Sequence, residues 1–544
     1  MKTRKFLWGL LACAAFSACS SEEVDKNAQN SEDKAFMKVK IVMAGGNSTS
    51  RGTDEGYETT PSSTDEYGIS DMLFIFYNDN GDYVTTGNVV TPNVDSSTES
   101  NLDAKSGAVI SLTLREGDAK PTKVIAYANG GNFAVNNFVG KSLSEAKHFA
   151  EIPNSYAEAN HFIMTNSTYY DNTESEIITE VAITDNCFKT TENEALNASP
   201  INIYLERLAA KVIVSEDADL ASHNKEIFGA NGNRIKFKIT GYLLNGTNSN
   251  SYWLKMVDES WFNASSEYLN WAYSDDYRCF WAKDVNYEES ASSSSLNFIS
   301  PNDLNLDAHQ SLVNDKQPKF CLENTLSLTS TSTANRFADA THVLVFGKYD
   351  FYKKGQDTPE SGNPDVFWYG GNAYLTEDLR NLWANNGGVY KKDGESWVKA
   401  PVEEYSLVSN GTNDGVTLQF NGLDGVTYTL NKNTSEVLNK VTLNEGYKES
   451  FKATGYKYGV GYFPVLIEHL FDDSEEGYGA TGELGVVRNH IYKLTINSIE
   501  NLAKGIFNGS SESPIVPDSK EQTYYLGTTL NILSWKTVSQ EVEL

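Results

Sequence analysis

Short runs of residues with a two-residue hydrophobic period recur along this chain and limit its fold more than any other feature. In residues 36–43, apolar side chains alternate with Lys38 and Lys40, which is the pattern of a strand with one buried face. Residues 488–497 alternate in the same way, and residues 389–400 have the pattern of a hairpin around an Asp-Gly turn. Helical periodicity is sparse, with short candidates at residues 142–150 and 376–384. We therefore expect an all-β protein with few short helices.

The chain is too long for a single hydrophobic core. Its length is 544 residues, and at about 150 residues per domain we expect two to four domains. Many short strands separated by turns favour stacked β-sandwiches. No internal repeat with a fixed period is found, so a solenoid is not expected.

The charge of the chain argues against one class of partner. Asp and Glu number 73 against 44 Lys and Arg, which gives a formal net charge of −29. Most of such a surface does not neutralise a phosphate backbone, so nucleic acid is not an expected partner.

The N-terminus has the features of a secretory signal. A basic start precedes a short apolar run, Phe6 to Ala18, which is too short to cross a bilayer as a helix. Small residues then lead to Cys19, which resembles the lipobox of bacterial lipoproteins. The alternative is an ordinary signal cut near Ala18. Residues 20–23 (SSEE) resemble the surface-export signal of Bacteroidetes lipoproteins, so we expect an outer-membrane lipoprotein precursor.

Two polar stretches flank the first predicted strand. Residues 20–34 have almost no apolar side chains and are typical of a flexible tether. Residues 45–65 contain Arg51, the only Arg between the signal and Arg115. An Arg in a Gly/Ser/Thr-rich loop is a good target for a trypsin-like protease, so we expect cleavage between Arg51 and Gly52.

No motif with catalytic or metal-binding spacing is found. The seven His residues are scattered, without an H-x-H or H-E-x-x-H pair, and neither a G-x-S-x-G elbow nor a phosphate-binding loop is present. His490 lies in a strand pattern and is expected to be structural. We therefore predict no catalytic residue, no metal and no cofactor.

The cysteines leave one question open. Once Cys13 is removed with the signal and Cys19 is acylated, Cys187, Cys279 and Cys321 remain. An odd number permits one disulfide with a spare thiol, or no disulfide.

Several segments together give the chain its resemblance to a known family. They are GISDMLFIFYNDNGDYV (68–84), KVIAYAN (123–129), IYLERLAAKVIV (203–214), GVVRNHIYKLTINSI (485–499) and LNILSWKTVSQEVEL (530–544). With the lipobox, they resemble the fimbrillins, the type V pilins of Bacteroidetes, and in particular the major-subunit branch of the minor fimbriae. Residues 245–401 have no clear counterpart.

The resemblance implies an architecture and a way of assembling. The architecture would be two tandem transthyretin-like β-sandwich domains, at 52–199 and 200–544, preceded by a signal (1–19) and a propeptide (20–51). Cys19 would carry lipid, and an Arg-specific protease would cut after Arg51. The strand that leaves would contain Met37, Val39, Ile41 and Met43. The strand donated to a neighbouring copy, 530–544, would contain Leu530, Ile532, Leu533, Trp535, Val538, Val542 and Leu544.

Elementary physical chemistry supports such an exchange. Withdrawing a strand exposes apolar surface and two unpaired sheet edges, which an incoming strand covers. The alternative is that the C-terminal segment completes its own domain. The resemblance implies further copies of the chain, accessory subunits, and host or bacterial surface ligands as partners. Two rival functions stay open, an accessory, tip or anchor fimbrial protein and a non-polymerising glycan-binding lipoprotein.

Overall fold

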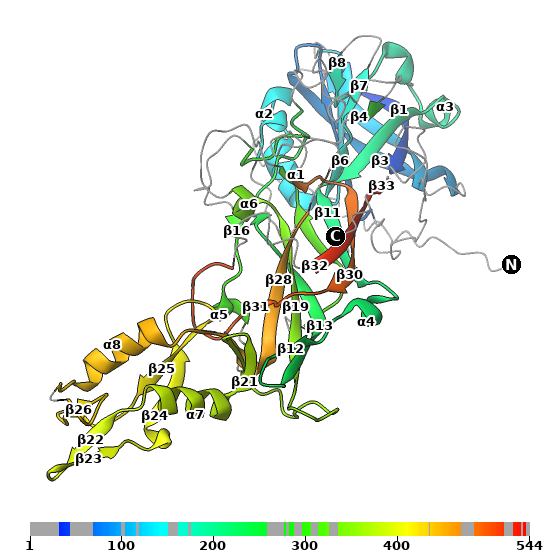
Figure 1. The fold of residues 1–544 in the computed structure, drawn as a ribbon. Coiled ribbons are helices and arrows are strands. Elements are labelled where there is room, and N and C mark those ends of the chain that lie inside the picture. The colour runs from blue at the N-terminus through cyan, green and yellow to red at the C-terminus, as the bar shows by residue number, and fades with distance from the viewer. Residues whose placement is uncertain are drawn as a thin grey trace.

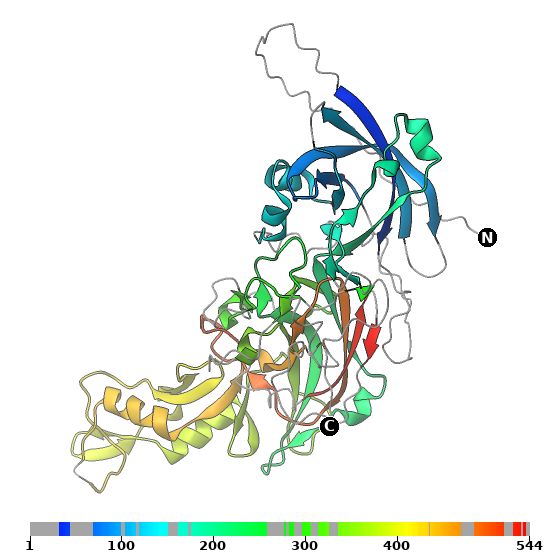
Figure 2. The same ribbon diagram turned by 90° about the horizontal axis from the view of Figure 1, so that it is seen from above.

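The structure is a computed structural model of an elongated, β-rich molecule (Figures 1 and 2). It describes residues 32–43, 69–98, 104–115, 119–150, 162–171, 176–257, 277–278, 282–287, 296–304, 306, 314–325, 336–434, 436–467, 469, 484–515, 526–534 and 537–539. The main sheets fall into an N-terminal unit (within 32–208), a middle unit (within 209–352 and 460–539) and a distal unit (within 366–456). Val366 and Tyr456 of the distal unit also belong to the core of the middle unit.

The N-terminal unit is built on one large sheet. Its strands are β1 (Glu32–Met43), β2 (Met72–Tyr77), β3 (Tyr83–Thr98), β4 (Ala104–Arg115), β5 (Lys123–Ala128), β6 (Met164–Asn166), β9 (Val181–Ala182) and β10 (Ile201–Arg207). Its helices are α1 (Gly131–Phe138), α2 (Leu143–Lys147) and α3 (Glu192–Leu196). Its strands β7 (Tyr169–Asp171) and β8 (Glu176–Ile178) form a small separate sheet with β15 (Tyr277–Arg278), which comes from a later part of the chain.

This large sheet closes on itself. The strand order is β2-β3-β4-β1-β10-β6-β5, and β5 pairs again with β2, while β9 adds to β5 outside the ring. One apolar cluster, formed by residues such as Phe74, Ile110 and Ile203, belongs to this sheet. Because the ring is closed, a strand such as β1 has a neighbour on each side.

The middle unit consists of two five-stranded sheets with a shared core. The first sheet contains β11 (Ala209–Glu216), β17 (Lys319–Leu322), β30 (His490–Ile499), β32 (Leu526–Ser534) and β33 (Thr537–Ser539). The second contains β12 (Ile227–Phe228), β13 (Arg234–Asn245), β19 (His342–Tyr352), β28 (Val460–Leu466) and β31 (Lys504–Gly505). Shorter elements are α4 (Leu220–His223), α5 (Pro301–Leu304), α6 (Arg336–Asp339), β14 (Thr247–Asn248), β16 (Leu296–Asn297), β18 (Asn324–Thr325) and β29 (Gly485–Val486).

The distal unit lies in the connection between β19 and β28, which are themselves paired neighbours. It contains β20 (Val366–Tyr369), β21 (Asn372–Leu375), β24 (Tyr405–Ser409), β25 (Gly415–Phe420) and β27 (Ala453–Tyr456) in one sheet, β22 (Tyr390–Asp393), β23 (Ser396–Lys399) and β26 (Tyr428–Thr429) in another, and helices α7 (Thr376–Asn386) and α8 (Lys440–Ser450). Both helices contribute to its own core, because Trp383 and Tyr447 belong to the same apolar cluster as Phe420. Figure 1 shows this unit extending away from the N-terminal unit.

The local predictions are confirmed. The fold is mainly β with short helices, and α2 and α7 lie in the two stretches with helical periodicity. Ser142 caps α2 in a capping box with Glu145, and Gly394 has the positive φ of +60° that the predicted hairpin turn requires. The division into two transthyretin-like domains stays a prediction. Within the described residues, no helix is both long and apolar enough to cross a membrane.

Candidate functional site

Strand β1 occupies an internal position in the closed sheet. It pairs antiparallel with β4 over its whole length, from Glu32 opposite Arg115 to Met43 opposite Ala104. On the other side, residues 39–43 pair in parallel with 201–205 of β10. Both backbone edges of this part of β1 are therefore in use.

The alternating apolar residues of β1 form part of the core. Met37 and Val39 are fully buried and Ile41 is 5% exposed. They belong to the same apolar cluster as Phe76 and Leu205 from neighbouring strands. Met43 lies in register with Leu205 at the end of the strand. The period of two thus places one row of side chains in the interior.

Polar contacts add to the hold on β1. The Nζ of Lys38, a buried side chain, donates to the carbonyl oxygen of Leu196 at 3.1 Å. Phe36 and Lys189 exchange two backbone hydrogen bonds of 2.8 and 2.7 Å. Residues 186–198 are therefore hydrogen-bonded to β1 in addition to the ladders that β1 forms with β4 and β10.

Removing β1 has a large free-energy cost. At about 1.5–3 kcal/mol for each buried side chain, Met37, Val39 and Ile41 together contribute roughly 5–9 kcal/mol as an upper bound. The stability of a whole domain is about 5–15 kcal/mol. A ring without β1 would therefore be poorly stable unless another strand took its place.

The C-terminal strand β32 pairs with its own chain in this structure. Its register with β30 runs from Leu526 opposite Ile499 to Ser534 opposite His490, placing Leu530 opposite Leu494 and Ile532 opposite Tyr492. The adjoining β33, which includes Val538, pairs back onto β32, with Leu533 opposite Thr537. Trp535, Val542 and Leu544 lie outside the described residues, as do Cys19, Arg51 and Gly52.

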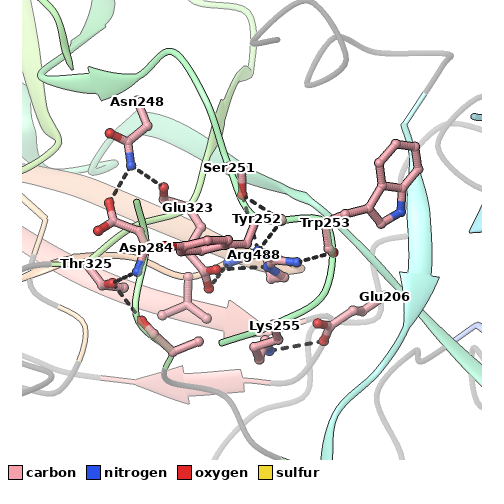
Figure 3. A network of polar contacts seen from close by, with 12 residues as sticks. Glu206, Asn248, Ser251, Tyr252, Trp253, Lys255, Asp284, Glu323, Thr325 and Arg488 are labelled. Carbon is pink, nitrogen blue, oxygen red and sulfur yellow. Dashed lines mark hydrogen bonds and ion pairs between the residues drawn. The ribbon is translucent and has the colours of Figure 1, made fainter. Parts of the chain in front are cut away.

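A buried polar network lies where the N-terminal and middle units meet (Figure 3). Glu206, near the end of β10, accepts from Lys255 Nζ at 3.1 Å, and both side chains are almost fully buried. The backbone N–H of Arg207 donates to Asn489 Oδ1 at 3.2 Å. The contact with Asn489 joins β10, which pairs with β1, to the turn that precedes β30.

Arg488 is the centre of this network. Its Nε donates to Glu323 Oε2 at 2.9 Å, and both side chains have no exposed surface. Its Nη1 donates to the carbonyl oxygen of Trp253 at 2.9 Å, and its Nη2 donates to the carbonyl oxygen of Tyr252 at 2.9 Å and to Ser251 Oγ at 3.2 Å. The fixed fork of the guanidinium thus holds segment 251–253 against the start of β30.

Segment 251–253 also contacts the N-terminal unit. The fully buried Trp253 packs edge-on against Phe138 at 4.7 Å and against Tyr127 at 5.2 Å between ring centroids, and it stacks on Phe133 at 5.6 Å. One short segment therefore binds to both units.

Burial shifts the pKa of two groups in this region. Burial raises the pKa of Asp284 from 3.8 to about 7, and the nearby charge of Glu323 raises it further. Hydrogen bonds from Asn248 and Asn286 lower this pKa, but they do not offset the effect of burial. Burial lowers the pKa of His469 from 6.5 to about 3, and the charge of Lys255 lowers it further. Near neutral pH the buried His469 is therefore uncharged.

The remaining predicted features are placed as follows. His490 is buried and its Nδ1 lies 2.8 Å from the carbonyl oxygen of Arg488, consistent with a structural residue. Cys187 and Cys321 are free thiols, and Cys279 lies outside the described residues. Among the residues described, no group of His, Cys, Asp or Glu could hold a metal ion.

Sequence reasoning did not identify the ion pair between Arg488 and Glu323. The only available signal was the segment GVVRNHIYKLTINSI, which carries Arg488 and was noted for its resemblance to fimbrillins. Nothing in the sequence links it to Glu323, which lies 165 positions earlier.

The same C-terminal region matches a protein-family model. Residues 454–541 match the family described as "Major fimbrial subunit protein type IV, Fimbrillin, C-terminal". Over these residues the chain is similar to the fimbrillin family. The match includes β28, β30 and β32, and it confirms the family that the sequence motifs indicated. The branch within the family stays a prediction. A search of curated protein sequences finds no match.

The solved structures with some likeness to this chain include the following three proteins. A protein of Parabacteroides distasonis, provisionally assigned to cell adhesion, has 11% identity and a TM-score of 0.35, covering 94% of this chain and 99% of that one. The tip fimbrial protein Mfa3 of Porphyromonas gingivalis, truncated at its C-terminus, has 10% identity and a TM-score of 0.33, covering 92% and 100%. A fimbrial assembly protein of Parabacteroides distasonis has 12% identity and a TM-score of 0.29, covering 73% and 100%. Likeness this low carries no argument about function.

Proposed function

We propose that this fimbrillin is a structural, non-enzymatic stalk subunit of a type V surface fimbria that polymerises by strand exchange. The precursor is exported as a lipoprotein acylated at Cys19 and is cleaved between Arg51 and Gly52. Strand β1 then leaves, and residues 530–544 of another copy fill its place. Display of many copies on the cell surface mediates adhesion.

One observation carries this proposal, the place of β1 in the closed sheet. The strand fills an internal position and contributes fully buried side chains, Met37 and Val39. The only Arg between the signal and Arg115 follows it in the chain. After cleavage at Arg51, β1 would be held by non-covalent contacts alone and could leave.

The vacated position would favour a replacement strand. Its edges would be the hydrogen-bonding groups of β4 on one side and of β10 on the other, and its floor the apolar cluster around Phe76 and Ile110. An incoming strand with apolar residues at every second position satisfies both. Leu530 and Ile532 provide that spacing. Because the donor and acceptor surfaces differ, the contact repeats and builds an open filament.

Limited proteolysis of the purified precursor tests this function. Trypsin should generate a new N-terminus at Gly52 and a ladder of polymers that resists SDS. Arg51→Ala should prevent both, whereas the matched Arg51→Lys variant keeps a trypsin site and should restore both. Deleting residues 530–544 should leave cleavage intact and abolish the ladder. Ladders in both the Arg51→Ala and the deletion variants would overturn the mechanism.

The distal unit favours a second candidate, an accessory or tip subunit. It has a core of its own and lies in the connection between β19 and β28, so the pairing of these two strands does not involve it. A separate unit of this kind suits ligand binding at one end of a filament. Ladders of this chain alone favour the stalk, whereas cleaved chains that only terminate ladders of another subunit favour the tip.

A further inference from the structure

The hairpin of β22 and β23 has an inner and an outer face. Val389 and Ala400, which directly flank it, are buried in the core of the distal unit and share a backbone hydrogen bond of 2.8 Å. Side chains alternate along a strand, so Lys391 lies on the inner side as well, where its Nζ pairs with Glu404 at 2.9 Å. Tyr390, Lys392, Trp397 and Lys399 therefore lie on the outer face.

These outer residues form a regular arrangement. Tyr390 lies directly opposite Lys399, and Lys392 directly opposite Trp397, with no register shift between the pairs. The two aromatic rings thus occupy one diagonal of a square and the two lysines the other, with diagonal neighbours about 7–8 Å apart at Cα. Both aromatic residues are half-buried and both lysines are exposed.

The charge of this face differs from that of the chain. The chain has a formal net charge of −29, yet the outer positions of β22 and β23 carry lysines and no carboxylate. Thr429 of β26, which lies opposite Tyr390, is buried and uncharged, so it adds no carboxylate beside this face. This face therefore suits an anionic partner.

We propose that the outer face of the β22–β23 hairpin, formed by Tyr390, Lys392, Trp397 and Lys399, binds an acidic glycan. The aromatic rings offer flat apolar surfaces for the C–H face of a sugar ring, and the lysines lie beside them for its carboxylates. The position of the hairpin suits binding of a long ligand, because Figure 1 shows β22 and β23 at the far end of the distal unit. The inference names a ligand class for the adhesive role and rests on that proposed role, but not on strand exchange.

Calorimetric titration of the full-length precursor with polygalacturonate tests the inference. We expect binding to polygalacturonate and none to neutral dextran at the same concentration. Lys392→Gln and Trp397→Ala should each weaken binding by about tenfold or more, which corresponds to about 1.4 kcal/mol or more. Trp397→Phe, which keeps an aromatic ring, should retain most of the binding and shows whether loss in Trp397→Ala reflects unfolding.

Lys448→Gln is the matched control, because Lys448 is an exposed lysine of the same unit on helix α8. It should bind as the unmodified chain does. Absence of binding, or equal weakening by Lys448→Gln and Lys392→Gln, would overturn the inference. Equal binding of polyglutamate that survives Trp397→Ala would also overturn it, in favour of an acidic peptide. The uncleavable Arg51→Ala chain should bind normally, so failure to polymerise and failure to bind are separate results.

Discussion

Arg488 Nε donates a hydrogen bond to Glu323 Oε2 at 2.9 Å, and neither side chain has any exposed surface. Each partner therefore depends on the other for compensation of its charge. Arg488 precedes β30, which holds β32, and through Trp253 it holds a segment packed against the N-terminal unit. The pair thus connects the surroundings of the two strands that we propose to exchange.

Breaking this pair should be strongly destabilising. Glu323→Gln leaves the Arg488 charge buried without its counterion, and we expect a loss of about 3–5 kcal/mol in the free energy of unfolding. Urea unfolding followed by circular dichroism measures it. The control is Glu449→Gln, which removes an exposed pair with Lys452 and should have little effect. Equal effects of the two substitutions would contradict the assigned importance of the buried pair.

Asp284 should make stability fall with rising pH. Its pKa in the folded chain is about 7, above the ordinary value of 3.8. Its contribution is therefore fully present below about pH 4 and is lost as pH rises through 7, by an amount on the order of 4 kcal/mol. Asp284→Asn removes this dependence. Between pH 4 and pH 8, the unfolding free energy of the unmodified chain should therefore fall relative to that of the variant.

The comparison with Asp284→Asn is needed because buried histidines act in the opposite direction. Burial lowers the pKa of His469 to about 3 and that of His342 to about 4. Their contributions are present above pH 6.5 and are lost as pH falls towards those values. They are common to both chains and cancel in the difference. A pH-independent difference between the two chains would show that Asp284 titrates normally.

Truncation of a core residue in β1 should weaken its hold on the ring. Met37→Ala should lower the free energy of unfolding of the uncleaved precursor by about 2–5 kcal/mol, since the side chain is completely buried. After cleavage with trypsin, ladders should form faster than in the unmodified chain. Lys34→Ala, at an exposed position of the same strand, should change neither quantity appreciably. Faster unfolding without faster ladder formation would separate β1 from assembly.

Two glycines of the distal unit should respond to alanine in opposite directions. Gly394 has a φ of +60°, which costs an alanine about 1–2 kcal/mol, so Gly394→Ala should destabilise the unit. Gly446 lies within α8 with open space around it, so Gly446→Ala should stabilise the unit by up to about 1 kcal/mol. Thermal unfolding measures both. A shift in the same direction would argue against one of the two backbone conformations.

Much of the local structure was predictable from the sequence. The alternation in residues 36–43 identified a strand, and the structure places Met37, Val39 and Ile41 in the core. Asp393-Gly394 identified the tight hairpin and Ser142 the start of a helix. These signals are local because side-chain periodicity, turn geometry and helix caps depend only on neighbouring residues.

The tertiary structure alone decided which distant segments meet. The sequence located β1 but not its place between β4 and β10 in a closed sheet, because strand order follows from the packing of the whole unit. It did not reveal the distal unit, whose core joins residues as far apart as Phe367 and Phe451. The buried pair of Glu323 and Arg488 has the same origin. The sequence contains many charged residues, and it does not show which of them are buried. A charged residue needs a specific partner for stability only where the fold removes it from water.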